Sequence, residues 1–159
     1  MKAKYFTKFA AVLAAVALSG CIGRAKQPEV KLSEIRVAGI GLRGASFIAA
    51  LEISNPNDVT LETDSISYMF EASDASGTGA WSQVTRGTYA QRIQVRDNSR
   101  TQVEIPLSFN YSDMSGALRS ILDKGTFNYR VSGQAYLREP LHKTIPFTKT
   151  GNLSLQGAR

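Results

Sequence analysis

Regular alternation of apolar and polar residues is the feature that most constrains what this chain can fold into. Over residues 126–138, apolar or small side chains occupy the odd positions from Phe127 to Leu137, and the even positions are mostly polar. The same alternation recurs between Val103 and Tyr111. Because successive side chains of a β-strand point to opposite faces, each segment predicts a long strand with one buried face.

Shorter segments with the same period predict further strands. In the first of these strands the alternation shifts by one residue near Ser33. Leu153 and Leu155 predict the last strand. The apolar residues expected to alternate along the strands before residue 96 are Val30, Leu32, Ile35 and Val37; Phe47, Ala49, Leu51 and Ile53; Ile66, Tyr68, Phe70 and Ala72; and Val84, Tyr89, Ile93 and Val95. Seven or more strands with one helix predict a mostly β fold, an antiparallel β-sandwich of immunoglobulin-like or fibronectin III-like shape.

Prolines and turn residues divide this pattern. Proline has no N–H to donate to a neighbouring strand, so Pro106 and Pro146 predict edge strands or bulges. The sequence Asp97-Asn98-Ser99 predicts a hairpin turn. The glycines between positions 39 and 44 superficially resemble a phosphate-binding loop, but no Lys-Ser/Thr pair follows them, which favours a turn or bulge.

One segment has helical spacing. Between residues 114 and 122, apolar side chains recur at steps of three or four, which predicts a short helix of about three turns. Either Ser112 or Asp113 can cap its N-terminus, and Gly125 stands where a left-handed residue after the helix is expected.

The N-terminus predicts export. Three lysines are followed by an apolar run over residues 9–18, which is too short to span a bilayer about 30 Å thick. The next residues, Leu18-Ser19-Gly20-Cys21, resemble the lipobox of bacterial lipoproteins. The resemblance implies cleavage between Gly20 and Cys21, with a diacylglycerol on Cys21, which is the chain's one cysteine. Ile22 stands where lipoproteins retained in the inner membrane often carry Asp, so we expect the inner leaflet of the outer membrane, facing the periplasm.

These features divide the chain into a signal peptide (1–20), a lipidated tether (21–29) and one domain (30–159). Removal of the signal peptide leaves sixteen basic and thirteen acidic side chains, a net charge of +3. So small an excess does not indicate nucleic-acid binding. A domain of about 130 residues buries enough surface to fold without disulfides.

A specific turn follows the second predicted strand at Asn55-Pro56-Asn57. Pro56 holds Asn55 extended, Asn57 tolerates a left-handed conformation, and both amides can bond to nearby backbone groups. We therefore expect a structural turn here. The motif also resembles the signature of the water stress and hypersensitive response (WHy) domain of late embryogenesis abundant type 2 proteins. The surrounding order agrees, with Ile105-Pro106-Leu107 before the helix and Tyr129-Arg130-Val131 after it.

That resemblance implies a non-enzymatic sandwich associated with tolerance of drying, cold or other stress. We therefore expect a membrane-anchored protein, held by its N-terminal lipid, that protects the cell envelope or client proteins during desiccation or osmotic stress. The alternative is an adaptor whose sheet edge or loops bind a specific envelope protein or lipid.

Residues typical of catalysis or metal binding are sparse. His142 is the one histidine, and it lies in a polar segment, which predicts a solvated loop residue. Asp58, Glu62 and Asp64 lack the spacing of a known calcium loop. We therefore expect no catalytic residue, no metal and no cofactor. The four arginines at 86, 92, 96 and 100 predict a solvated face that protects a sheet edge, or alternatively a contact with anionic lipid.

Overall fold

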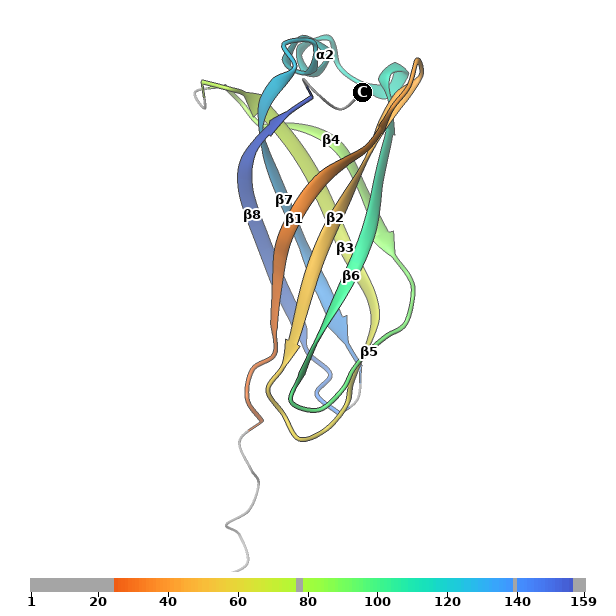
Figure 1. Cartoon of the computed structure of the whole chain (residues 1–159), viewed down its shortest axis with the longest axis vertical. Helices are drawn as coiled ribbons and strands as arrows, with labels where there is room; N and C mark the ends of the chain where they lie inside the picture. The colour runs from red at the N-terminus through yellow and green to blue at the C-terminus, as the bar shows by residue number, and fades with distance from the viewer. Residues whose placement is uncertain (1–24, 77–78, 139, 156–159) are drawn as a thin grey trace, which may run out of the picture.

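The computed structural model describes residues 25–76, 79–138 and 140–155. In this part of the chain, eight strands and one short α-helix form an elongated β-sandwich with the helix at one end (Figure 1). The elements are β1 (Glu29–Ile40), β2 (Gly44–Asn55), β3 (Leu61–Asp74), β4 (Ser82–Tyr89), β5 (Ile93–Val95), β6 (Ser99–Asn110), the 3-10 turn η1 (Tyr111–Asp113), α2 (Gly116–Asp123), β7 (Thr126–Leu137) and β8 (Thr144–Ser154). The predicted antiparallel sandwich is confirmed.

The strands form two sheets. One has the order β1-β2-β6, and the other has the order β4-β3-β7-β8, with β5 also paired to β3. Pro106 lies in β6 and Pro146 in β8, and each of these strands is at an edge, as predicted. The edge strand β1 has register shifts at Ser33 and near Ala38, so the predicted slip is also confirmed.

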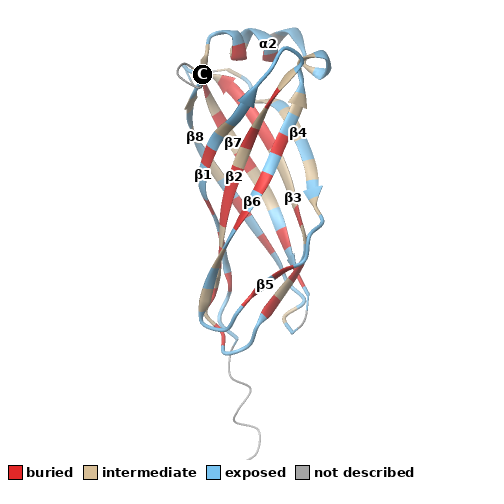
Figure 2. Cartoon of the chain, turned by 45° about the vertical axis from the view of Figure 1, so that its right-hand side comes forward, coloured by how far each residue is buried: buried red, intermediate tan, exposed pale blue. Residues whose placement is uncertain are grey.

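The core lies between the two sheets. Figure 2 shows buried residues alternating along the strands, as the sequence pattern requires. Phe47 from β2 and Phe70 from β3 are fully buried, and their ring centroids are 5.3 Å apart in an edge-to-face arrangement. This contact joins the two sheets. Phe127 is also fully buried, on the inner face of β7.

Large rings fill the space beside two glycines of the five-stranded sheet. A Cβ on Gly133 would lie 2.5 Å from the Phe147 ring and 2.1 Å from the backbone oxygen of Ser67. A Cβ on Gly151 would lie 2.7 Å from the ring of Tyr129. These positions are glycine because the rings and the neighbouring strand occupy the volume of a side chain.

The helix differs from the prediction at its start. It begins at Gly116 and is capped by Ser115, whose hydroxyl accepts a hydrogen bond from the Leu118 N–H at 3.2 Å. The expected caps lie instead in η1, because Met114 is extended (φ −92°, ψ 142°) and separates the two segments. The helix therefore has eight residues and is shorter than three turns. Gly125 follows it with φ 72°, as expected.

Two strand predictions also need correction. The turn at residues 97–99 exists, with Asn98 at φ 44°, but it is not a hairpin. It links β5, which pairs with β3, to β6, which pairs with β2 in the other sheet. In addition, Pro146 and Leu153 belong to one strand, β8, and Leu155 lies beyond its end. Local periodicity reports that a segment is extended and carries no information about its partner.

Burial of Tyr129 predicts a loss of stability at high pH. Desolvation raises the pKa of its phenol above the usual value of about 10. Between the unfolded and folded pKa values, the unfolded state has lost the proton and the folded state has kept it, so the free energy of unfolding decreases as pH rises above about 10. Urea unfolding at about pH 9 and about pH 11 measures this, and Tyr129→Phe should show a smaller decrease. An equal decrease in the two proteins would contradict the assignment to Tyr129.

Candidate functional site

The end of β2 forms a tightly bonded corner around Asn55, which is 1% exposed. Its side-chain oxygen accepts a hydrogen bond from the Asn57 N–H at 3.1 Å, and this bond fixes the orientation of the amide. Its nitrogen then donates to the carbonyl oxygens of Val59 (2.7 Å), Val95 (3.1 Å) and Arg96 (3.0 Å). One side chain therefore closes the turn after β2 and also binds the end of β5 and the residue after it.

Asn57 extends this corner to the N-terminal segment. Its side-chain oxygen accepts from the Lys26 N–H at 2.7 Å, and its nitrogen donates to the Lys26 carbonyl at 2.9 Å. The amide thus satisfies both backbone groups of one residue, as a neighbouring strand would. We call this pair the Lys26 clasp. Pro28 is buried just beyond it, so the last residues of the expected tether contact the domain.

A third segment joins at Asn98. Its N–H donates to the Asn57 carbonyl at 3.0 Å, and its side chain donates to Asp58 at 2.7 Å. Asn98 has a positive φ, whereas Asn57 does not, although the sequence suggested that Asn57 could adopt one. The Asn-Pro-Asn corner therefore comprises Lys26 and residues 55–59 and 95–98. The bonds to residues 26 and 95–98 are long-range, and the sequence contains no signal for them.

The polar atoms of the two motif amides all bond to backbone groups or to each other. Backbone partners of this kind stabilise a conformation and leave no donor directed at a ligand. The geometry of Asn55 and Asn57 is therefore that of a structural joint.

The other candidate residues are dispersed. His142 is exposed in a turn, at φ 40°. Glu62 accepts a hydrogen bond from Gln94 at 2.8 Å, and Asp64 pairs with Arg138 at 2.9 Å. Among the residues that the structure describes, no three His, Cys, Asp or Glu side chains are grouped to hold a metal ion. The same residues include no helix with the length and apolarity needed to cross a membrane.

The four arginines are all exposed and lie on several elements. Arg86 is in β4, Arg92 and Arg96 are in the segments flanking β5, and Arg100 is in β6. Arg100 is 3.6 Å from a carboxylate oxygen of Glu52, an exposed ion pair that contributes little stability.

A partly buried ion pair on the five-stranded sheet was not predicted. Glu71 and Arg130 pair across β3 and β7 with two bonds, of 2.7 and 2.8 Å, and the Glu71 side chain is 11% exposed. The guanidinium lies 4.6 Å from the ring centroid of Trp81. The hydrogen bond to Glu71 raises the pKa of Arg130, which remains charged. The groups satisfy one another, so the cluster is a structural ion pair.

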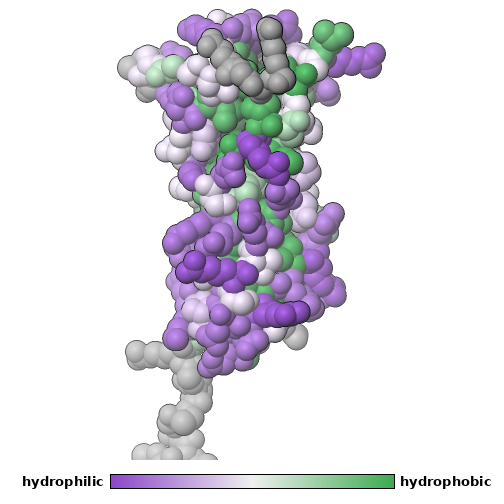
Figure 3. Space-filling model, in the orientation of Figure 1, coloured by the Kyte–Doolittle hydropathy of each residue, from purple (hydrophilic) through white to green (hydrophobic). Residues whose placement is uncertain are grey.

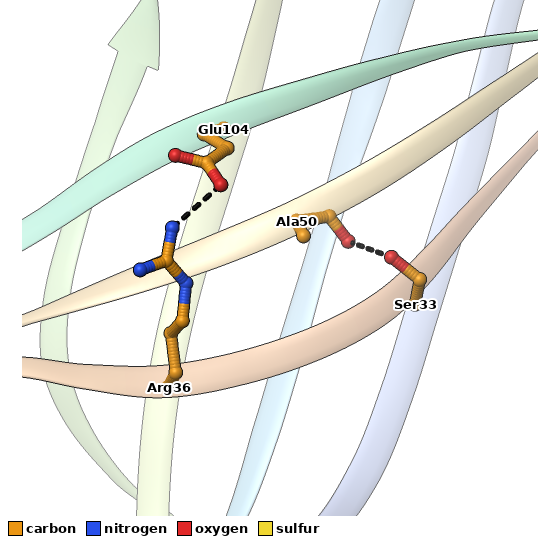
Figure 4. A network of polar contacts seen from close by, with 4 residues as sticks. All are labelled: Ser33, Arg36, Ala50 and Glu104. Atoms are coloured by element: carbon orange, nitrogen blue, oxygen red, sulfur yellow. Dashed lines mark hydrogen bonds and ion pairs between the residues drawn. The ribbon is translucent and has the colours of Figure 1, made fainter.

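The outer faces of the two sheets differ in chemistry. On the three-stranded sheet, Arg36 of β1 reaches over β2 to Glu104 of β6, and the Ser33 hydroxyl donates to the Ala50 carbonyl at 2.8 Å (Figure 4). On the five-stranded sheet, most outward residues are uncharged and polar. A shallow hollow of ≈ 680 Å³ crosses this face, and Arg86 is the one charged residue among those that line it in the described chain.

The fold and the corner define a class of protein: a two-sheet, antiparallel β-sandwich with one helical crossover and a closed Asn-Pro-Asn joint. Residues 50–151 match the family model described as late embryogenesis abundant protein, type 2. The chain therefore belongs to the late embryogenesis abundant type 2 family.

Solved structures agree on the fold. An Arabidopsis thaliana protein in solution is 17% identical, with a TM-score of 0.66 over 82% of this chain and 83% of that one. The solution structure of a late embryogenesis abundant (LEA) protein is 17% identical, with a TM-score of 0.59 over 94% and 86% of the two chains. A crystallised protein of Archaeoglobus fulgidus is 16% identical, with a TM-score of 0.55 over 79% and 94%. No curated protein matches the chain significantly.

Proposed function

We propose that this chain is a non-catalytic, lipid-anchored protein of the bacterial cell envelope whose folded domain protects envelope components during water loss. The observation that carries the proposal is the family match over residues 50–151, since the family is associated with stress. The closed Asn-Pro-Asn corner and the dispersed ionisable groups are consistent with a role that needs no chemistry.

The anchor is the N-terminal lipid. Cleavage after Gly20 makes Cys21 the first residue, and its sulfur carries the diacylglycerol. Ile22 supports delivery to the outer membrane, where the domain faces the periplasm from the inner leaflet. The lone cysteine supports this arrangement, because an acylated sulfur forms no disulfide.

The outer face of the five-stranded sheet is the surface best suited to protection. The register places Ser67, Gln134 and Pro146 side by side, and Ser132 beside Thr148. Hydroxyl and amide groups can form hydrogen bonds with client proteins or lipid headgroups that lose their water, and unsatisfied polar groups are costly. The surface is available without any folding on drying, because the sandwich has an apolar core.

Cys21→Ala tests the anchor and its role together. In the native bacterium, we expect the wild-type chain to incorporate labelled palmitate and the variant to incorporate none. Survival after drying should then decrease in the variant to the level of a deletion strain. Incorporation that persists in Cys21→Ala would contradict lipidation at this residue. Equal survival of the deletion and wild-type strains after both drying and osmotic shock would contradict the protective role.

The edge strands limit where an adaptor of this fold could bind a partner. Prolines interrupt the free edges of β6 and β8, and β1 is bulged, so strand addition is disfavoured there. The remaining edge, β4, contains no proline, so a dedicated partner would bind along β4 or at the loops. Crosslinking in live cells separates the two functions: one stoichiometric partner supports the adaptor, and a diffuse set of neighbours supports general protection.

A further inference from the structure

The Lys26 clasp lies at one end of the elongated sandwich. Figure 1 shows that the described chain begins at the end where β2 meets the loop to β3, whereas α2 lies at the opposite end. The strands β1 and β2 have 12 residues each. At about 3.3 Å per residue, the two ends are separated by about 40 Å.

The length of chain before the clasp limits how far this end can move from the lipid. Between Cys21 and Lys26 there are five Cα–Cα steps, which span at most about 18 Å when fully extended. Without the clasp, the first residue held by the domain is the buried Pro28, seven steps from Cys21, which span about 25 Å. The two hydrogen bonds of Asn57 therefore shorten the effective tether by somewhat more than a quarter.

The surface at this end suits a polar, hydrated partner. Figure 3 shows hydrophilic residues over the end opposite α2, at the bottom of the view. Exposed Lys26, Arg96 and Lys143 are accompanied by exposed Asp58 and Asp97, and Arg100, opposite Ser54, pairs with Glu52, so the charges nearly balance. A nearly neutral surface is not attracted strongly to anionic lipid. The length of the tether is then the main limit on the distance between this end and the bilayer.

We propose that the Lys26 clasp docks the Asn-Pro-Asn corner against the headgroup surface of the bilayer that holds the Cys21 lipid. The α2 end, with Leu42 fully exposed at 102% in the neighbouring β1–β2 turn, is then presented away from the membrane. This inference rests on the proposed lipid anchor. It assigns to the second asparagine of the motif a positioning role toward the membrane.

The test uses the full acylated chain, purified from bacterial membranes and placed in phosphatidylethanolamine/phosphatidylglycerol vesicles with headgroup nitroxide quenchers. A bimane fluorophore is attached at Thr60→Cys, beside the corner, or at Leu42→Cys, at the far end. We expect quenching at position 60 to exceed quenching at position 42 several-fold. The ratio should hold in high salt, because tether length and not charge sets it.

Two variants separate the clasp from the rest of the fold. Asn57→Ala frees Lys26, and quenching at position 60 should decrease about twofold as the tether lengthens. A twelve-residue Gly/Ser insertion between Gly23 and Arg24 leaves the clasp intact and should decrease quenching further, since a flexible linker of that length adds about 20 Å of mean reach. Circular dichroism before labelling checks that each variant is folded.

Vesicle flotation distinguishes the two proposals. A chain that does not float with the vesicles overturns the lipid anchor and the docking together. A chain that floats but is quenched equally at positions 60 and 42 overturns the docking alone. Unchanged quenching at position 60 in the insertion variant would also overturn the docking alone.

Discussion

Replacing Gly133 with alanine should lower the free energy of unfolding by about 3–5 kcal/mol, a large part of the stability of a domain of this size. The added Cβ would lie 2.1 Å from the Ser67 backbone oxygen in the neighbouring strand and 2.5 Å from the Phe147 ring. The ring can rotate, but the strand β3 cannot move without disturbing its pairing with β7. Overpacking at a paired backbone is therefore expected to cost more than a side-chain clash.

Gly116→Ala is the matched control for this substitution. A Cβ on Gly116 would meet no atom within 4 Å, and the residue opens α2. Alanine is the better helix former, so stability should be unchanged or rise by up to about 0.5–1 kcal/mol. Urea unfolding of both variants measures the contrast. If Gly133→Ala lost less than about 1 kcal/mol, the close approach of β3 and β7 at this point would be wrong.

Removing the first amide of the motif should be nearly as damaging. Asn55→Ala removes one donor from the carbonyl oxygens of Val59, Val95 and Arg96 at a site that is 1% exposed, and only the Arg96 oxygen is known to keep another donor, the Ser99 hydroxyl at 2.8 Å. An unsatisfied buried acceptor costs about 1–3 kcal/mol, and water entry relieves part of this, so we expect a total loss of about 3–5 kcal/mol. Asn55→Asp should be at least as unstable, because a carboxylate oxygen would then face these carbonyls.

Asn152→Ala provides the comparison for Asn55. Asn152 is exposed, and its side chain donates one hydrogen bond, at 3.3 Å, to the side chain of Asn128. Its loss should change stability by less than about 0.5 kcal/mol. Thermal unfolding ranks the variants, and 3–5 kcal/mol corresponds to a midpoint lower by roughly 10–20 °C. A midpoint for Asn55→Ala within a few degrees of wild type would show that the corner does not hold the sandwich together.

Much of this fold could be predicted from the sequence, because its signals are local. Alternation along residues 126–138 marks a strand with one buried face, and the absence of an N–H in Pro106 and Pro146 marks edges. The pairing of β5 with β3 could not be predicted, because a three-residue strand has almost no pattern. The cap of α2 was missed for a similar reason: residues 112, 113 and 115 are all competent caps, and only the extended Met114 decides among them.

Only the local part of the candidate site could be predicted from the sequence. The turn at Asn55-Pro56-Asn57 follows from the conformational limits of proline and the short reach of asparagine. The partners at Lys26 and Val95 lie 31 and 40 residues away in sequence. The same is true of the Glu71–Arg130 pair, whose members are separated by 59 residues. Such contacts depend on how the strands are ordered, which a single sequence does not encode locally.

The most direct test of this account is the hydrogen exchange rate of the Lys26 backbone amide, measured by NMR on the folded domain. The Lys26 N–H donates a hydrogen bond to the side chain of Asn57, a residue that is 8% exposed. We therefore expect the Lys26 amide to exchange much more slowly than the amide of a free chain. In Asn57→Ala, this amide should exchange at the unprotected rate, while amides within β2 and β6 remain protected. An unprotected Lys26 amide in the wild-type domain would contradict the clasp, and with it the joint that we place between the tether and the sandwich.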